Sequence, residues 1–304
     1  MAAGIITTGS IPKALWPGVY AFWGQKYDDH GMEYRDLFDI KSSSKSYEEV
    51  VEIIGFGLAP QKNEGTSTQY ATSRQGFTNR FTNKAYALGF IVTKEAIDDN
   101  QYEEIMYDRT ERLAFSMRTT KEIVGANVYN RAFDTSFTFG DGKALCVADH
   151  PTDSGDQSNV LSVAADLSEA SLEDLVIQIA DAKDSAGLQI ALKPTTLHVA
   201  TNEIFEAERI LGSVLQNDTA NNAINALRSM SIIPGGTKVN HYFTDADAWF
   251  LRTTAPRGMC WFQRKEIEFG DDNDFDTENM KYKGYERYVP GVGDWRGVFG
   301  SGGA

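Results

Sequence analysis

The chain contains 304 residues, of which 41% are apolar, 24% charged and 12% aromatic. This length corresponds to about two domains of ~150 residues, or to two interleaved modules. The aromatic content excludes an intrinsically disordered chain. The 43 acidic and 29 basic side chains give a formal net charge of -14, which repels a phosphate backbone and argues against tight nucleic-acid binding.

Cysteine content and terminal composition favour the cell interior. Cys146 and Cys260 are too few and too far apart for a disulfide framework or a zinc cluster, and they are compatible with a reducing compartment. Residues 1–12 lack the basic and apolar segments of a secretory signal. The densest apolar stretch, 86–92, is far shorter than the ~20 residues of a membrane helix. We therefore expect a soluble, acidic protein with no membrane contact.

Residues 1–46 form an aromatic-rich segment without clear periodicity. Pro12 and Pro17 are predicted to interrupt any helix, and Trp16 and Trp23 need a surface that covers them. The segment is predicted to be an N-terminal arm. It packs either on its own domain or on a neighbouring subunit, and both interpretations remain open.

Two strands are predicted at 47–58 and 77–92, with a polar connection at 59–76 between them. This connection exceeds the ~12–15 residues beyond which structureless loops become uncommon. A two-stranded hairpin is also only marginally stable alone in water. Residues 47–94 are therefore predicted to be a projecting β-hairpin that finds its partner elsewhere, on another chain. The alternative is a flexible surface loop or a lid over a pocket.

A long helix is predicted over 97–133. Residues 98–100 offer capping side chains at its start, and its apolar residues recur at helical spacing. From residue 98 to residue 132 such a helix is roughly 52 Å long at 1.5 Å per residue. Its apolar stripe is narrow and Gly125 interrupts it. We expect a rod that lies across a thin layer rather than a helix buried in a globule.

The rest of the chain mixes helices and short strands. A polar segment at 134–166 precedes two helices and a strand between 168 and 211, and further strands follow at 237–269. A last strand with glycine-rich turns is predicted over 281–301. This order of a strand pair, a long helix, a mixed module and returning strands predicts an α+β fold.

Candidate catalytic residues are sparse. Cys146 and His150 lie close enough in sequence for a thiol–imidazole nucleophile, but no third orienting residue is indicated. His198 lies in an apolar strand and is predicted to be a structural histidine. The acidic run 271–276 has Thr277 where a calcium loop requires glycine, so a solvated loop is the better interpretation.

Other short motifs are incomplete. The glycines of 55–57 are followed by Pro60 and by no helix, unlike a dinucleotide-binding turn. The Ser42–Lys45 stretch matches SxxK without the companion motifs, and the sequon at Asn217 has no meaning without secretion. We predict no catalytic, cofactor-binding or metal site, and no enzymatic activity.

The order of these parts resembles a known family. The stretches that carry the resemblance are 55–60 followed by 75–78, then 87–95, 142–151 and 297–301. The chain resembles the tailed-bacteriophage major capsid proteins of the Hong Kong 97 type, most closely the Mu-like major head subunit family, over residues 15–301.

The resemblance implies a domain organisation. Residues 1–46 would be the N-terminal arm and 47–94 the extended loop that lies over a neighbouring subunit. Residues 95–165 and 267–304 would form the peripheral domain, which contains the spine helix 97–133. Residues 166–266 would form the axial domain at the capsomer centre.

The resemblance also implies a structural function in the virion. Copies would assemble into hexamers and pentamers of an icosahedral head, put together in the host bacterial cytoplasm, with packaged double-stranded DNA contacted only weakly. A separate scaffolding protein is expected, because the charged helical N-terminal segment of some members is missing. A portal and a decoration protein are further expected partners. Neither Lys62 nor Lys84 matches the crosslinking motif of some relatives, so no crosslink is predicted.

Two alternatives remain open at this point. One is an encapsulin-type protein shell on the same fold. The other is a soluble hydrolase in which residues 59–76 act as a lid over a Cys146–His150 pair.

Overall fold

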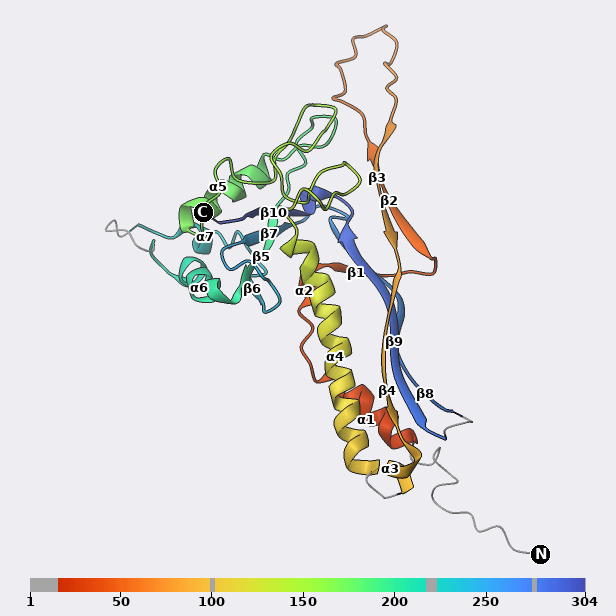
Figure 1. The fold of residues 1–304 in the computed structure, drawn as a ribbon. Helices are drawn as coiled ribbons and strands as arrows, with labels where there is room; N and C mark the ends of the chain where they lie inside the picture. Colours follow the sequence, from red (N-terminus) through yellow and green to blue (C-terminus); the bar gives the residue numbers. More distant parts are fainter. Residues whose placement is uncertain (1–15, 99–101, 217–222, 275–277, 304) are drawn as a thin grey trace, which may run out of the picture.

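The computed structural model describes residues 16–98, 102–216, 223–274 and 278–303. Figure 1 shows three parts: a compact module of short strands and helices, a leg in which a long helix lies along a twisted sheet, and a β-ribbon that projects from the body. Both helices and strands contribute to each large part, which confirms the α+β class.

The first half of the chain builds the leg and the ribbon. Its elements are α1 (Trp16–Asp28), α2 (Tyr34–Leu37), β1 (Asp39–Ser42), β2 (Tyr47–Ile54), β3 (Arg74–Thr82), β4 (Lys84–Val92), α3 (Lys94–Asp98) and α4 (Tyr102–Asn130). The second half builds the compact module and returns to the leg. Its elements are α5 (Glu169–Ala180), β5 (Pro194–Ala200), η3 (Thr201–Glu203), α6 (Ile204–Gly212), α7 (Ala226–Ser229), β6 (Thr237–Asn240), β7 (Trp249–Thr253), β8 (Met259–Asn273), β9 (Met280–Val292), η4 (Trp295–Gly297) and β10 (Val298–Ser301).

The strands form three separate sheets. The leg contains the order β1-β8-β9-β4, in which β8 and β9 form a long antiparallel pair. The compact module contains the order β10-β7-β5-β6. The ribbon is the antiparallel pair of β2 and β3 alone. No strand pairing among the described residues joins the ribbon to either larger sheet.

Helix α4 runs along the leg and buries one face against it. Met106, Leu113 and Met117 are buried there together with residues of β8, β9 and α1. At Gly125, an added Cβ would lie 3.2 Å from the Tyr34 Cβ. The glycine that interrupts the apolar stripe therefore allows α2 to approach the helix closely. The helix is shorter than predicted: it ends at Asn130, α3 is a separate helix at its start, and residues 99–101 lie outside the described residues.

The predicted strand 77–92 is in fact two strands that belong to different sheets. β3 pairs with β2, whereas β4 pairs with β9 along its whole length. The change occurs at Asn83, a buried residue whose Nδ2 donates to Ser43 Oγ at 2.9 Å and to Lys45 O at 3.0 Å. The prediction of a hairpin over 47–94 was therefore too long, since the hairpin ends at Thr82.

The described part of the N-terminal arm packs on its own subunit. Pro17 does not break α1, because it lies in the first turn, where its missing N–H costs no hydrogen bond. Trp23 and Tyr27 of α1 are buried against α4 and β9. For residues 16–46 this supports the first of the two interpretations; residues 1–15, including Pro12, lie outside the described residues.

The predicted domain boundaries do not coincide with the sheets. The boundary at residue 267 falls inside β8, and β10 pairs with β7 in the compact module rather than with the leg. The chain therefore passes between leg and module more often than the prediction assumed.

The surface is large for the mass. A compact globule of this mass would expose roughly 12,700 Å², whereas the chain exposes 17,289 Å². The thin leg and the projecting ribbon of Figure 1 are the parts that a globule of this mass would not have. In the part of the chain that the structure describes, no helix has both the length and the apolar character needed to span a bilayer.

Candidate functional site

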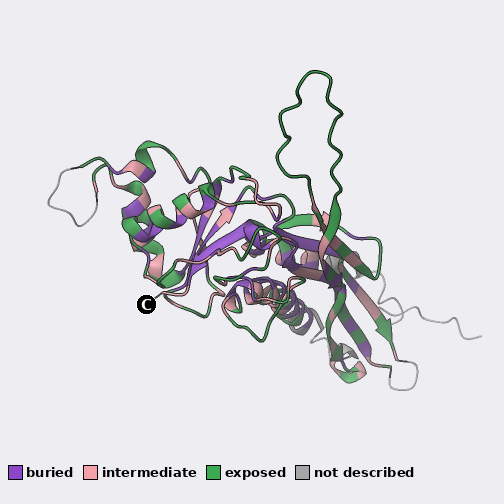
Figure 2. Cartoon of the chain, turned by 90° about the horizontal axis from the view of Figure 1, so that it is seen from above, coloured by how far each residue is buried: buried purple, intermediate pink, exposed green. Residues whose placement is uncertain are grey.

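The most prominent surface feature is the loop 55–73, which joins β2 to β3 and is here called the extended loop. It contains no helix or strand, and Figure 2 shows it projecting, fully exposed, from the rest of the chain. Leu58 is 85% exposed and Tyr70 is 95% exposed. Apolar side chains on a projecting segment are typical of a surface that is covered by a partner.

A second exposed apolar surface lies on the compact module. It is formed by α6, the following loop and the residue after α7, and it is here called the module tip. Its exposed apolar residues are Phe205, Val214, Leu215, Ile224 and Met230. Leu215 and Ile224 form an isolated β-bridge that holds the two sides of the tip together.

Polar bonds hold the base of the extended loop to the body. Asn79 of β3 donates from Nδ2 to Gly293 O at 3.0 Å, and its Oδ1 accepts from Gly140 N at 2.6 Å. Arg74 at the start of β3 forms an ion pair with Asp153. The ribbon therefore contacts segments that are far away in sequence. Beside these polar bonds, Phe81 of β3 packs on Cys260 and Phe262.

Cys146 and His150, the pair of the hydrolase alternative, do not form a nucleophilic site. Cys146 is buried, and burial raises the pKa of its thiol well above the ordinary value. Its sulfur lies 4.0 Å from Asn159 Nδ2, and no hydrogen bond joins Cys146 to His150 among the described residues. A thiol that stays protonated is a poor nucleophile.

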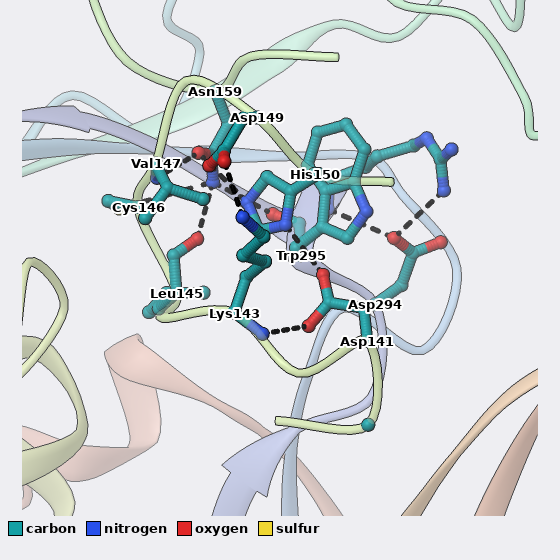
Figure 3. Close-up of polar contacts among 12 residues, drawn as sticks. Asp141, Lys143, Leu145, Cys146, Val147, Asp149, His150, Asn159, Asp294 and Trp295 are labelled. Carbon is teal, nitrogen blue, oxygen red and sulfur yellow. Dashed lines mark hydrogen bonds and ion pairs between the residues drawn. The ribbon is translucent and has the colours of Figure 1, made fainter. Parts of the chain in front are cut away.

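His150 instead belongs to a buried structural cluster (Figure 3). Its Nδ1 lies 2.6 Å from Asp141 Oδ2, and its Nε2 lies 3.2 Å from Asn159 Oδ1. The imidazole ring stacks on Trp295, with the two ring centres 4.2 Å apart and the planes nearly parallel. Both nitrogens are thus occupied, which leaves neither free to act as a general base.

Asn159 joins this cluster to β10. Its Nδ2 donates to Leu145 O at 2.7 Å and to Val298 O at 3.0 Å, and its Oδ1 accepts from Val147 N at 2.9 Å. The polar segment 134–166, which has no long helix or strand, is fixed to the compact module in this way. The sequence showed no signal for Asn159, because a polar residue in a polar loop has no periodicity.

The other candidate residues have structural positions. His198 is buried in β5, where burial lowers its pKa to about 3 and its Nε2 bonds Thr196 Oγ1 at 2.8 Å. The prediction of a satisfied structural histidine holds only in part, because Nδ1 is buried without a hydrogen-bond partner among the described residues. The acidic run is not a solvated loop at its start, because Asp271 and Asp272 belong to β8 and pair with β9. Residues 275–277 lie outside the described residues.

The structure describes two of the three incomplete motifs. The glycines of 55–57 lie in the extended loop, the Ser42–Lys45 stretch begins at the last residue of β1, and Asn217 lies outside the described residues. Within 16–98, 102–216, 223–274 and 278–303, no group of three or more His, Cys, Asp or Glu side chains could hold a metal ion.

A buried charged cluster, which the sequence analysis did not find, connects α1, α4 and β9. Lys121 and Glu286 form an ion pair at 3.1 Å, with side chains that are 3% and 0% exposed. The Tyr27 hydroxyl donates to Glu286 Oε2 at 3.3 Å. Burial raises the pKa of Glu286, and it raises the pKa of the neighbouring Glu122 to about 7. The residues of this buried charged cluster come from three distant segments of the chain, so no sequence pattern predicts the cluster.

The comparisons with known proteins agree with the fold. A family model described as phage capsid protein matches residues 78–300, which is more than half of the chain. A search of curated proteins finds no match.

Several solved structures are similar in fold. The virus-like particle from Pyrococcus furiosus has a TM-score of 0.53 at 9% identity, covering 94% of this chain and 98% of that chain. A structure from Mycobacterium phage Patience has a TM-score of 0.54 at 12% identity, covering 97% of this chain and 88% of that chain. The capsid of Myoviridae phage XM1 has a TM-score of 0.50 at 10% identity, covering 89% of this chain and 90% of that chain. The chain belongs to the phage capsid protein family and has the α+β fold of tailed-phage major capsid proteins of the Hong Kong 97 type.

Proposed function

We propose that this phage capsid protein assembles into hexamers and pentamers of an icosahedral head that encloses double-stranded DNA, and that its role is structural rather than catalytic. The observation that carries the proposal is the extended loop, whose exposed apolar side chains have no cover on their own subunit. A second copy that covers this loop supplies the missing burial.

The two exposed apolar surfaces suit different contacts within one shell. The extended loop projects away from the body at one end of the ribbon, and the module tip lies on the far side of the compact module (Figure 1). Contacts between different surfaces of identical subunits generate closed rings when the rotation closes. Hexamers and pentamers are rings of this kind.

The domain names of the family can be assigned to the observed parts. In this proposal the arm is the segment up to β1, the ribbon β2–β3 carries the extended loop, and the leg with spine helix α4 is the peripheral domain. The compact module is the axial domain. These bounds follow the sheets and differ from the predicted ones at residues 83–94, 259–266 and 298–301.

Charge supports weak contact with the packaged DNA. The formal net charge of -14 opposes tight binding to a phosphate backbone. Free movement of DNA during packaging and ejection requires such a weakly binding wall. The proposal places the protein in the virion, after assembly in the host bacterial cytoplasm with a scaffolding protein, a portal and a decoration protein as partners.

The proposal is tested by sedimentation and electron microscopy of the purified chain at increasing concentration. We expect rings of capsomer size or closed shells, because the uncovered surfaces associate by mass action. A chain that remains a monomer at every concentration, and that forms no shells when it is expressed with its gene neighbourhood, contradicts the proposal.

A second candidate is an encapsulin-type shell, which the similarity to the Pyrococcus furiosus virus-like particle favours. The contents of shells isolated from cells that express the complete gene neighbourhood distinguish the phage head from the encapsulin-type shell. Nuclease-protected double-stranded DNA inside the shells supports the phage head, and an enclosed protein cargo without DNA supports the encapsulin-type shell.

A further inference from the structure

The inner end of the ribbon β2–β3 is fixed to the leg, because Phe81 packs on Cys260 and Phe262 and because Asn79 bonds Gly293 O. The ribbon β2–β3 forms a sheet of its own, and a two-stranded ribbon has little stiffness or stability alone. The outer end of the ribbon, next to the extended loop, therefore needs side-chain contacts of its own to fix its direction. These contacts surround a hollow of about 390 Å³ between β2, Ser185 and Arg296.

The carboxylate of Glu52 lines this hollow and contacts residues on its other side. Glu52, two residues before the end of β2, accepts a hydrogen bond from Ser185 Oγ. Its Oε1 also lies 3.5 Å from Arg296 Nη1, and this arginine side chain is 2% exposed. Arg296 Nη2 donates to Ser185 Oγ at 3.2 Å, which closes a triangle of three side chains.

The partners of Glu52 are held firmly by the compact module. Arg296 donates from Nε to Lys183 O at 2.8 Å, and its guanidinium lies 4.3 Å from the centre of the Trp295 ring. Asp294 Oδ1 lies 3.3 Å from Arg296 Nη1. A guanidinium fixed at several points is a rigid anchor for a carboxylate.

The backbone of the ribbon is shaped to present this carboxylate. The pairing register shifts between Val51 and Ile53, so that Gly76 and Phe77 of β3 both face Glu52. Such a bulge redirects a side chain. A Cβ at residue 76 would lie 2.4 Å from Glu52 Oε2, so the glycine leaves the space that the carboxylate occupies.

We propose that Glu52, Ser185 and Arg296 form a latch that fixes the direction of the extended loop before the loop meets a second copy. A loop that is already oriented loses less conformational freedom when it docks, which favours association. The docking part of this inference rests on the proposed function, whereas the orienting part concerns a single subunit.

The orienting part is tested by a distance measurement in the full-length chain. Spin labels are attached to Thr66→Cys in the extended loop and Asp174→Cys on α5, both exposed; the native Cys146 and Cys260 are buried. Pulsed electron paramagnetic resonance then gives the distribution of the distance between the labels. We expect a narrow distribution in the otherwise unchanged chain and a broad one in Glu52→Gln.

Two further variants make the result specific. Glu49→Gln removes a carboxylate whose partner, Arg80 at 2.8 Å, lies within the ribbon, so the narrow distribution should persist. Gly76→Ala keeps every charge but occupies the space of the Glu52 carboxylate, so it should broaden the distribution as Glu52→Gln does. Far-UV circular dichroism confirms that each variant is folded. Narrow distributions in both Glu52→Gln and Gly76→Ala overturn the latch.

Assembly supplies the second readout. If the latch prepares the loop for docking, the concentration at which half of the subunits assemble rises by about tenfold in Glu52→Gln, equivalent to ~1.4 kcal/mol per subunit. A broad distance distribution with unchanged assembly overturns the docking part alone. Absence of assembly in every chain, with the distances as expected, contradicts the proposed function and leaves the latch intact.

Discussion

Glu122 is a buried carboxyl whose shifted pKa makes the stability of the folded subunit depend on pH. It lies on α4, where its Oε2 accepts a hydrogen bond from Tyr34 N at 2.7 Å and its Oε1 has no hydrogen-bond partner. Burial is the main cause that raises the pKa of Glu122 to about 7, against an ordinary value near 4.5. The folded state therefore favours the protonated carboxyl, whereas the unfolded state releases the proton at lower pH.

The sign of the pH effect follows from this difference. Between pH 4.5 and about 7 the folded state binds more protons at Glu122 than the unfolded state, so its contribution to stability falls as pH rises. We expect Glu122→Gln, which is always neutral, to lose this slope and to gain on the order of 2 kcal/mol relative to the unchanged chain between pH 5 and pH 8. Urea unfolding at pH 5 and at pH 8 measures this change in the free energy of unfolding. Glu111→Gln on the exposed side of α4 is the control, and equal slopes in all three chains would contradict the prediction.

The buried Lys121–Glu286 pair leads to a second prediction at this scale. Removal of one partner leaves an uncompensated charge in the interior, which costs about 3–5 kcal/mol. Lys121→Met is therefore expected to lower the free energy of unfolding by that amount in a denaturant titration. The exposed pair Arg112 and Asp108, with N–O distance 2.9 Å, provides the control, since Arg112→Met should change the free energy of unfolding far less than Lys121→Met does. A similar loss in both variants would mean that the burial of the pair has no energetic role.

At the scale of elements, Asn83 directs the chain from the ribbon into the leg. Its side chain satisfies two groups of the β1–β2 connection, and its N donates to Ser46 O at 3.1 Å. The Ser43 hydroxyl and the Lys45 carbonyl lose these bonds in Asn83→Ala. We expect a loss of about 1–3 kcal/mol in the free energy of unfolding, because two hydrogen bonds are lost at about 0.5–1.5 kcal/mol each. Asn63→Ala, in the exposed loop, should have no measurable effect; an equal effect of both changes would contradict this role of Asn83.

The same elements show which features the sequence could predict. The apolar periodicity of α4 and the polar length of the loop are local properties, so the long helix and the projecting loop were predicted correctly. The division of 77–92 into two strands was missed, because the pairing of β4 with β9 involves residues about two hundred positions away. The Glu52 latch and the Asn159 cluster were missed for the same reason: their partners meet only in the folded chain.

At the scale of the whole molecule, the account depends on surfaces that a single chain cannot cover. The burial that stabilises the subunit lies in the leg, the compact module and their junction. The extended loop contributes almost nothing to it, since its residues are exposed throughout. Folding of the subunit and closure of the shell should therefore be separable, because they depend on different parts of the chain.

Replacing residues 56–72 by an Asn-Gly turn tests this separation most directly. Such a turn closes the hairpin at the end of the paired strands. The control is the double variant Lys62→Ser and Glu64→Ser, which keeps the loop at its full length. Sedimentation and electron microscopy, with urea unfolding alongside, should show a shortened chain that folds with nearly unchanged stability but forms no closed shells, while the control forms them. Closed shells from the shortened chain at the same concentration would contradict the account.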